Sequence, residues 1–172
     1  MSLIEKAKAY TDTLLEKCAH YTYHNPHHTE SVFSRAAYLA MAEWVEWEDL
    51  EDLQIAALFH DTGFTVQYEK NEYFGARIAR KWIDEQRQDE KRIQKIEGII
   101  MATVLFSKPK SHLEEIIQDA DLDNIWTKEE FFYSQNYLKE IRTIGGVDMP
   151  DCAYWQFRRV LFRSNKVSIF LF

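Results

Sequence analysis

Apolar residues recur along the chain at intervals of three and four, the spacing that places them on one face of an α-helix. In SLIEKAKAYTDTLLEKCAHY this stripe comprises Leu3, Ala7, Tyr10, Leu14, Cys18 and Tyr21. A second helix is predicted from Asn25, as N-cap, and Pro26, as first helical residue, to about Trp44. A third is predicted from about Asp49 to Asp61. It is apolar on nearly all sides, and TGF ends it.

Caps and breakers predict four further helices. Their expected bounds are Asn71 to Gln86, Asp89 to the Lys108-Pro109 stop, a sixth opened by the Ser111–Glu114 capping box, and a seventh opened by Thr127–Glu130 and ended by Gly145-Gly146. The chain shows no alternating strand pattern of convincing length and no internal repeat. We therefore predict an all-α fold, a single compact bundle of roughly seven or eight helices.

Composition narrows the function classes. A chain of 172 residues is long enough for one domain with an apolar core. Its net charge of −7 argues against a nonspecific nucleic-acid binder and against a polybasic membrane binder. The two cysteines form no CxxC motif, which fits a reducing compartment, and the N-terminus lacks the apolar run of a signal peptide. We expect a cytoplasmic protein. The sequence does not reveal its oligomeric state.

The sequence pattern at the end of the chain differs from that of the rest. The octet FRRVLFRS (157–164), followed by NKVSIFLF, resembles the conceptual translation of a common sequencing-adapter end. We therefore predict a domain over residues 1–156, with the natural chain diverging near Gln156, and a tail over 157–172 that carries no function. The alternative is an ordinary amphipathic C-terminal helix. An intact reading frame through this octet at the source locus would exclude the artefact.

Helical geometry, about 100° per residue, separates inward from outward polar residues. In the second helix His28 lies at the edge of the apolar arc, whereas His27 lies opposite it and is expected to face solvent. His60 extends the apolar stripe of the third helix and Asp61 follows at its end. In EEIIQDADLDNIW, Asp121 falls on the flank of the buried arc.

An ionised carboxylate at the end of a buried helix is costly unless a cation or strong donors meet it. Mixed imidazole and carboxylate groups suit a first-row divalent ion such as Mn, Fe, Co, Ni or Zn, with positions left open for water. Taken singly, an inward histidine is more often a satisfied core residue, and an aspartate at a helix border is usually solvated or capping. The four residues occurring together, in this order, favour a metal site.

These motifs resemble a known family. YHNPHHT, ALFHDTGF and DADLD, in that order, resemble the H…HD…D signature of the HD superfamily of metal-dependent phosphohydrolases. YHNxxHT, ALFHDTGF…NE and MAT…LEEIIQDADLDN are similar to small bacterial proteins described as predicted HD-superfamily phosphohydrolases. The resemblance covers roughly Tyr21 to Arg142.

The resemblance implies that His28, His60, Asp61 and Asp121 ligate one divalent ion (Mn, Fe, Co, Ni, Zn or Mg). YHNxxH is also similar to the opening motif of cyclic-nucleotide phosphodiesterases, in which the histidine after tyrosine donates a proton to the leaving oxygen. By that mapping His24 is the candidate general acid. Asp61 or Asp121 is also expected to orient the attacking hydroxide, and Asp61 is taken as the catalytic candidate.

Two departures from related enzymes bear on the chemistry. Two-metal members carry extra histidines between HD and the last aspartate, where this chain has only His112, so one ion is expected. The acidic pair that nucleotidase and alarmone-hydrolase relatives place just after HD is absent from TGFTVQ. Glu72 is a candidate for orienting water, but Asn71 as a helix N-cap followed by a first-turn acid explains Asn71-Glu72 equally well.

The predicted function is metal-dependent hydrolysis of a phosphate monoester or diester. The expected substrate is a nucleotide or another small phosphoester, without nucleic-acid or membrane partners. The alternative is a metal-binding regulatory or ligand-sensing HD module without turnover. Stoichiometric metal without turnover on any phosphoester would favour the module.

Overall fold

The computed structural model describes residues 1–164, apart from the side chains at 125, 126 and 162–164. This part of the chain is helical without any β-strand, which confirms the predicted all-α fold. Its eight α-helices and three short 3₁₀ segments are α1 (Leu3–Leu15), η1 (Glu16–Cys18), α2 (Pro26–Ala42), α3 (Trp47–Phe59), η2 (Thr62–Thr65), α4 (Asn71–Glu85), α5 (Glu90–Met101), α6 (His112–Asp121), η3 (Asp123–Trp126), α7 (Glu130–Thr143) and α8 (Asp151–Ser164).

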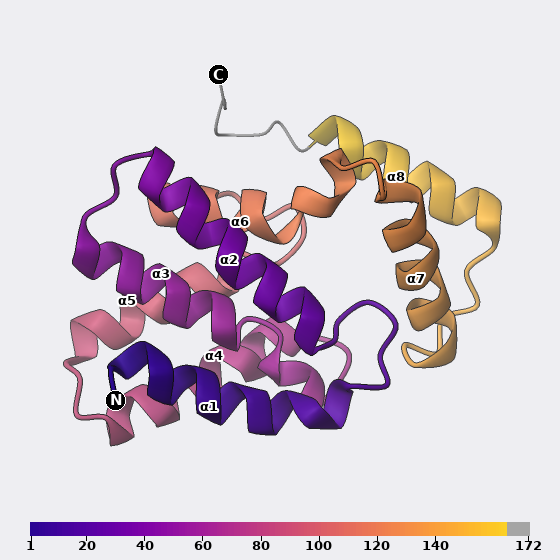
Figure 1. Cartoon of the computed structure of the whole chain (residues 1–172). Helices are drawn as coiled ribbons and strands as arrows, with labels where there is room; N and C mark the ends of the chain where they lie inside the picture. Colours follow the sequence, from indigo (N-terminus) through magenta and orange to yellow (C-terminus); the bar gives the residue numbers. More distant parts are fainter. Residues whose placement is uncertain (165–172) are drawn as a thin grey trace.

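Helix α3 is the central helix of the larger bundle and contacts α1, α2, α4, α5 and α6 (Figure 1). Its sequence explains this position, because a helix that is apolar on all sides is stable only when it is covered on all sides. The buried side chains include Leu53, Ile55, Ala56, Ala57, Leu58 and Phe59. The residues that directly follow α3 therefore emerge inside the bundle.

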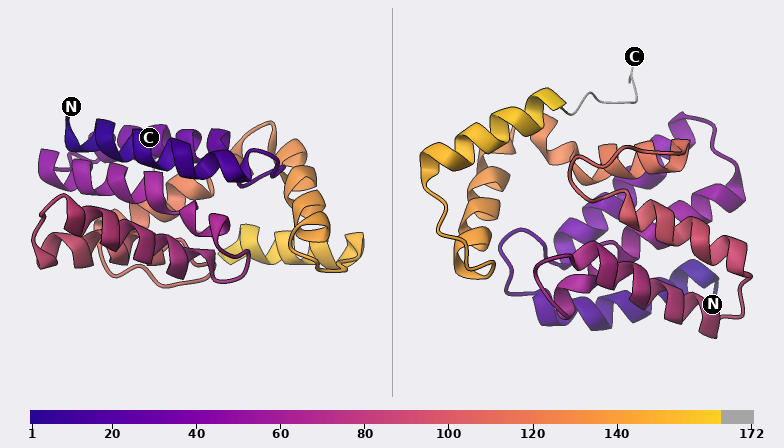
Figure 2. Two further views of the ribbon diagram at one scale, coloured as in Figure 1. Left: turned by 90° about the horizontal axis from the view of Figure 1, so that it is seen from below. Right: turned by 180° about the vertical axis from the view of Figure 1, so that it is seen from behind.

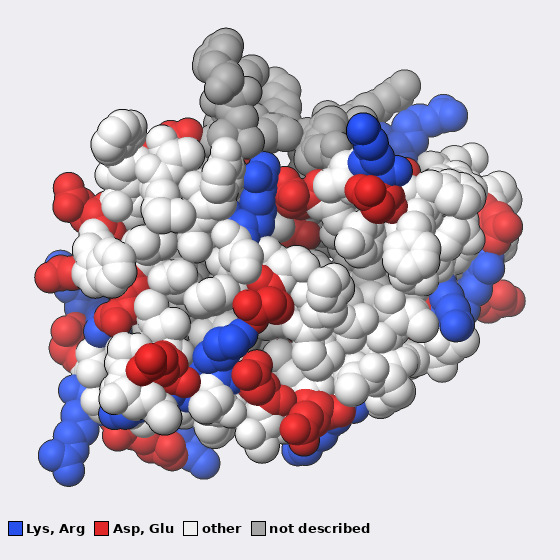
Figure 3. Space-filling model, in the orientation of Figure 1, with Lys and Arg blue, Asp and Glu red and all other residues white. Residues whose placement is uncertain are grey.

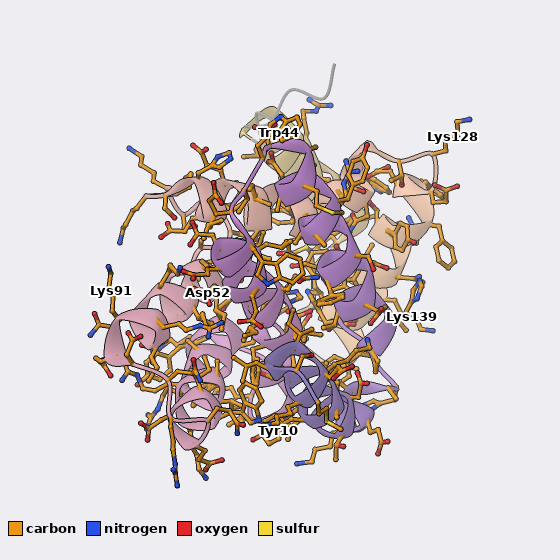
Figure 4. All side chains as sticks on the ribbon, turned by 60° about the vertical axis from the view of Figure 1, so that its left-hand side comes forward. Tyr10, Trp44, Asp52, Lys91, Lys128 and Lys139 are labelled. Atoms are coloured by element: carbon orange, nitrogen blue, oxygen red, sulfur yellow. The ribbon has the colours of Figure 1, made fainter. Side chains whose placement is uncertain are left out.

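A buried ion-pair network joins α3 to α5. The Asp52 carboxylate accepts hydrogen bonds from Arg92 Nε at 2.6 Å and pairs with Lys95 Nζ at 2.5 Å. Asp52 lies between the two helices, whereas Lys91 projects outward (Figure 4). Acidic and basic side chains are also interspersed on the face shown in Figure 3, where neither sign gathers into a continuous patch.

Helices α7 and α8 form a second, smaller unit at one side of the bundle (Figures 1 and 2). Its own apolar core consists of Leu138, Ile141 and Tyr154. The Tyr154 hydroxyl donates to the Ser134 carbonyl at 2.6 Å, which ties α8 to α7. The smaller unit packs beside the loop that precedes α2, where Thr22 Oγ1 donates to the Asn136 carbonyl at 2.7 Å.

Two predicted helices are shorter than the apolar spacing indicated. The first helix ends at Leu15 and continues only as the turn η1, and its buried residues are Ala7, Thr11 and Leu15, with Tyr10 37% exposed. The fifth ends at Met101, well before Lys108-Pro109. Polar side chains end it, because the Thr103 hydroxyl donates to the Ile100 carbonyl at 2.8 Å and Ser107 Oγ donates to the Ala102 carbonyl at 2.7 Å.

Of the two predicted capping boxes, one forms only in half and the other is wrong. Ser111 caps α6 as predicted, since its hydroxyl accepts from the Glu114 amide at 3.3 Å. The other half of this box does not form, because the Glu114 carboxylate accepts from the Lys110 amide at 2.7 Å. Thr127 does not cap α7; its hydroxyl donates to the Asn124 carbonyl instead, at 3.0 Å. Glu130 is also occupied elsewhere, because its carboxylate accepts from Ser134 Oγ at 2.6 Å. Helix α7 begins after Glu129 without any side-chain cap.

The octet at 157–164 is helical as the second half of α8, and Arg158 and Leu161 within it are buried. An amphipathic sequence of this kind forms a helix whatever its origin. The divergence near Gln156 therefore stays a prediction. The remainder of the predicted tail, residues 165–172, lies outside the described residues.

Candidate metal centre

The first histidine of the site is held by the start of α2. Asn25 is the N-cap, as predicted, and its Oδ1 accepts from the amides of His27 at 3.0 Å and His28 at 3.2 Å. Pro26 occupies the first helical position, where a missing N–H leaves no intrahelical bond unmade. This cap orients the first turn so that the largely buried His28 ring points into the bundle, whereas His27 is exposed, as predicted.

His60 and Asp61 directly follow α3 and are 1% and 4% exposed. The turn η2 after them lies directly against α4. An added Cβ on Gly63 would stand 1.8 Å from the Asn71 carbonyl oxygen, and one on Gly75 would stand 2.9 Å from those of Phe59 and His60. Glycine is therefore required at both positions. The TGF motif ends the helix and also brings α4 against the His60-Asp61 turn.

Asp121, the last residue of α6, completes a cluster of four polar side chains from three parts of the bundle. His28 Nε2 lies 3.1 Å from Asp121 Oδ1 and 3.5 Å from Asp61 Oδ2. His60 Nε2 lies 3.2 Å from Asp61 Oδ2 and 3.6 Å from Asp121 Oδ1. One ligand atom each from His28, His60 and Asp121 lies within 4.8 Å of the other two. All four predicted ligands are thus brought together.

The donor atoms fit a divalent cation. The Ala57 carbonyl accepts from His60 Nδ1 at 2.7 Å, so Nδ1 carries the ring proton and Nε2 can present a lone pair to the cluster. His60 Nε2 and Asp61 Oδ2 are both buried without a hydrogen-bond partner among the described residues. Unpartnered buried polar atoms are rare, and an ion coordinated between them would satisfy both.

The electrostatics of the cluster lead to the same conclusion. Burial alone lowers the pKa of His60, but the carboxylates of Asp61 and Asp121 together raise that pKa well above its usual value. Burial alone raises the pKa of Asp121, whereas the hydrogen bond with His28 and the nearby His60 imidazole bring that pKa far below its usual value. Both carboxylates are therefore ionised and favour a positive charge between the imidazoles, which a proton or a divalent cation supplies.

His24, the predicted acid, lies in the turn before α2 and is held by a residue that the sequence did not reveal. The buried Glu140 of α7 accepts from His24 Nδ1 at 2.5 Å and from the His24 amide at 2.9 Å. It also accepts from the Tyr23 amide at 2.6 Å and the Tyr68 hydroxyl at 3.3 Å. Phe64 stacks on the other side of the imidazole, with ring centroids 4.4 Å apart.

The Glu140 carboxylate favours the protonated form of His24. Burial alone lowers the pKa of His24, but the hydrogen bond to Glu140 and the nearby carboxylates raise it overall. Burial alone raises the pKa of Glu140, and its bond with His24 lowers it overall. With Nδ1 bonded to Glu140, Nε2 is the nitrogen left to act on a ligand, as a general acid requires.

Two cavities adjoin the cluster. The smaller, about 120 Å³, is lined by His24, Asp61 and Asp121 together with Glu72 of α4. Arg158 and Leu161 of α8 also line it, and Arg158 pairs with Glu130 at 2.9 Å. Burial is the main cause that raises the pKa of Glu72.

The larger cavity, about 430 Å³, opens between α2, η3 and α7 and is lined by His28, Arg35, Asn124, Phe132, Tyr133 and Asn136. Tyr23 and Asp121 line both cavities, so the two spaces adjoin at the cluster. The Tyr23 hydroxyl accepts from Asn124 Nδ2 at 2.5 Å, which holds the ring between them. His112 lies at the start of α6 and is exposed, so it does not belong to the cluster.

The family follows from comparison with known proteins. A family model described as HD domain matches residues 27–123, more than half of the chain, and the protein therefore belongs to the HD-domain family, whose members are generally metal-dependent hydrolases. All four residues of the cluster lie within the matched segment, whereas His24 and Glu140 lie outside it. The comparisons with curated proteins and with solved structures find no match. Among the described residues, no helix has the length and apolar character needed to cross a membrane.

Proposed function

We propose that this protein hydrolyses phosphate esters with one divalent ion held by His28, His60, Asp61 and Asp121 and with His24 as general acid. The observation that carries this proposal is the smaller cavity, in which two carboxylates of the cluster and a histidine with a raised pKa face one another. A cation site next to a proton donor is the arrangement that ester hydrolysis requires.

Each residue of the site has its own role in the proposed reaction. When bound, the ion lowers the pKa of water and polarises a phosphoryl oxygen. Asp61, whose Oδ2 has no hydrogen-bond partner among the described residues, orients the attacking water. His24 Nε2 donates a proton to the leaving alkoxide, while Glu140 fixes the His24 tautomer and stabilises its charge. The Phe64 ring restricts the imidazole to that orientation.

The substrate proposed is a nucleotide or another small phosphoester. A cavity of about 430 Å³ adjoining the cluster is within the size range of small-molecule sites. Its aromatic Phe132 and Tyr133 suit a flat organic group, and Asn136 and Arg35 offer hydrogen-bond donors. These features support an ester with a sizeable organic part over a minimal one such as a short alkyl phosphate.

The test has two stages. Metal content of the purified protein is measured first, before and after chelation. The stripped protein is then reloaded with Mn, Co, Ni, Zn, Fe or Mg and assayed on p-nitrophenyl phosphate, bis-p-nitrophenyl phosphate, nucleoside monophosphates and cyclic nucleotides. We expect about one ion per chain and metal-dependent turnover of at least one ester.

The outcomes separate the candidate functions. Stoichiometric metal without turnover on any of these esters would replace the enzyme with a regulatory or ligand-sensing metal module. The absence of bound metal after reloading would exclude both the metal-dependent enzyme and the metal-binding module. Turnover that persists unchanged after complete chelation would show that the protein is a hydrolase but would exclude the proposed metal-dependent mechanism.

A further inference from the structure

Besides Asp61 and Asp121, the smaller cavity is lined by a third carboxylate, that of Glu72. It lies in the first turn of α4 and lines the cavity with His24, Asp61 and Asp121. The close packing of α4 on the turn η2, through Gly63 and Gly75, brings it there. Its position is therefore set by the same contact that shapes the turn after His60-Asp61.

The helix N-terminus explains why a carboxylate is tolerated at this position. Lys70, in the left-handed conformation with φ of 58°, is the N-cap of α4 and provides no side-chain cap. The N-cap role considered for Asn71 is therefore wrong, because Asn71 is the first residue of the helix. The positive end of the helix dipole favours a negative charge in the first turn of α4. This effect does not explain why the side chain lies in the cavity, because an exposed first-turn acid gains the same stabilisation.

Glu72 and Glu140 differ in how fully they are bonded. Glu140 accepts hydrogen bonds from two amides, an imidazole and a phenol. Among the described side chains, none donates to the Glu72 carboxylate or pairs with it. Asp61 and Asp121 are directed at the two imidazoles of the cluster. Glu72 is thus the carboxylate lining this cavity that neither belongs to the cluster nor pairs with a described side chain.

On the basis of the proposed function, we infer that Glu72 is a catalytic residue that accepts the proton of the attacking water. As the water oxygen bonds to phosphorus, its O–H bond breaks and the proton passes to Glu72. The P–O ester bond breaks, its electron pair stays on the leaving oxygen, and that oxygen takes the proton of His24.

Esters with different leaving groups distinguish the proton acceptor, Glu72, from the proton donor, His24. The variants are Glu72→Gln and His24→Ala, with Glu69→Gln, an exposed glutamate three residues away, as the matched control. Each is assayed as the metal-loaded full chain on p-nitrophenyl phosphate and on phenyl phosphate. The first has a good leaving group that needs little protonation, and the second has a poorer one. Metal content and melting temperature are measured for every variant.

We expect Glu72→Gln to lower kcat by about 100- to 10,000-fold on both esters, with unchanged metal content and melting temperature. His24→Ala should lose much more turnover on phenyl phosphate than on p-nitrophenyl phosphate, and Glu69→Gln should match the wild type. Glu72→Asp, which keeps a carboxylate one methylene farther back, should retain more turnover than Glu72→Gln.

Three results would overturn the inference. If the wild type is active and Glu72→Gln has the same turnover, Glu72 is not the proton acceptor, and the proposed function remains intact. A loss confined to phenyl phosphate would make Glu72 part of leaving-group protonation instead. Equal losses in the Asp and Gln variants, together with lost metal or a lowered melting temperature, would assign it a structural role. If the wild type turns over neither these esters nor the wider panel, the proposed function and this inference fail together.

Discussion

The metal cluster and the His24–Glu140 pair lie side by side but are held in different ways. The cluster residues come from α2, α3 and α6, and these helices share the large apolar core around α3. The His24–Glu140 pair joins a loop before α2 to α7, whose described core cluster is small, with Leu138, Ile141 and Tyr154 as its buried members. The cluster is thus positioned by packing, and the acid by hydrogen bonds to one buried carboxylate.

This difference predicts that the two halves can be separated by mutation. Loss of a buried charge or ligand at the cluster should affect metal, stability and turnover together. Loss at the acid pair should affect turnover and leave the metal in place. The following substitutions test that separation, from the largest expected effect to the smallest.

Asp61→Ala should have the largest effect. Without this carboxylate the cluster loses a ligand, so bound metal falls below stoichiometry and turnover is abolished. The stabilisation from metal is lost as well, about 3 kcal/mol when free metal is a hundred times its Kd. Metal analysis and thermal unfolding with and without chelator measure both. Stoichiometric metal in the variant would remove Asp61 from the ligand set.

His24→Ala should keep the metal and lower kcat about 100- to 10,000-fold on substrates with poor leaving groups. The cluster atoms lie on other elements, so the melting temperature should still rise when metal is added. Metal loss in this variant would contradict the acid assignment and show that the two halves are coupled.

Glu140→Gln should have a smaller effect on turnover, about 10- to 100-fold, which is typical when a functional histidine loses the partner that orients it. The amide keeps the size of the side chain but cannot stabilise the imidazolium or accept all four hydrogen bonds. Stability should fall by about 1–3 kcal/mol. Steady-state kinetics, denaturant unfolding and metal analysis distinguish this result from damage to the cluster.

His27→Ala should have the smallest effect, because this side chain is exposed and is not part of the cluster. We expect a stability change within about 0.5 kcal/mol and an unchanged kcat. His27 does line the larger cavity, so a raised KM without a change in kcat would identify that cavity as the substrate site.

Capping residues in the sequence predicted a helix start correctly where the cap bonds to amides only a few residues away. Asn25 and Ser111 cap the helices that they were expected to cap, because the bonded amides are two or three residues away. Thr127 fits the same pattern, yet its hydroxyl bonds to the Asn124 carbonyl, and Glu130 binds Ser134 and the distant Arg158. A capping pattern fails where other partners compete for its groups.

The helical class and the four residues of the cluster could be predicted from the sequence, because helical spacing sends His28, His60 and Asp121 towards apolar faces. The carboxylate that holds His24 could be identified only from the packing of distant segments. Glu140 is 116 residues from His24 along the chain, and nothing around it distinguishes a buried glutamate from a solvated one. Orienting water through Glu72 is one of two interpretations of Asn71-Glu72 in the sequence, and the place of Glu72 in the cavity depends on Gly63 and Gly75, which allow α4 to reach the His60-Asp61 turn. Contacts between distant segments depend on how the helices pack, and that packing has no local sequence signal.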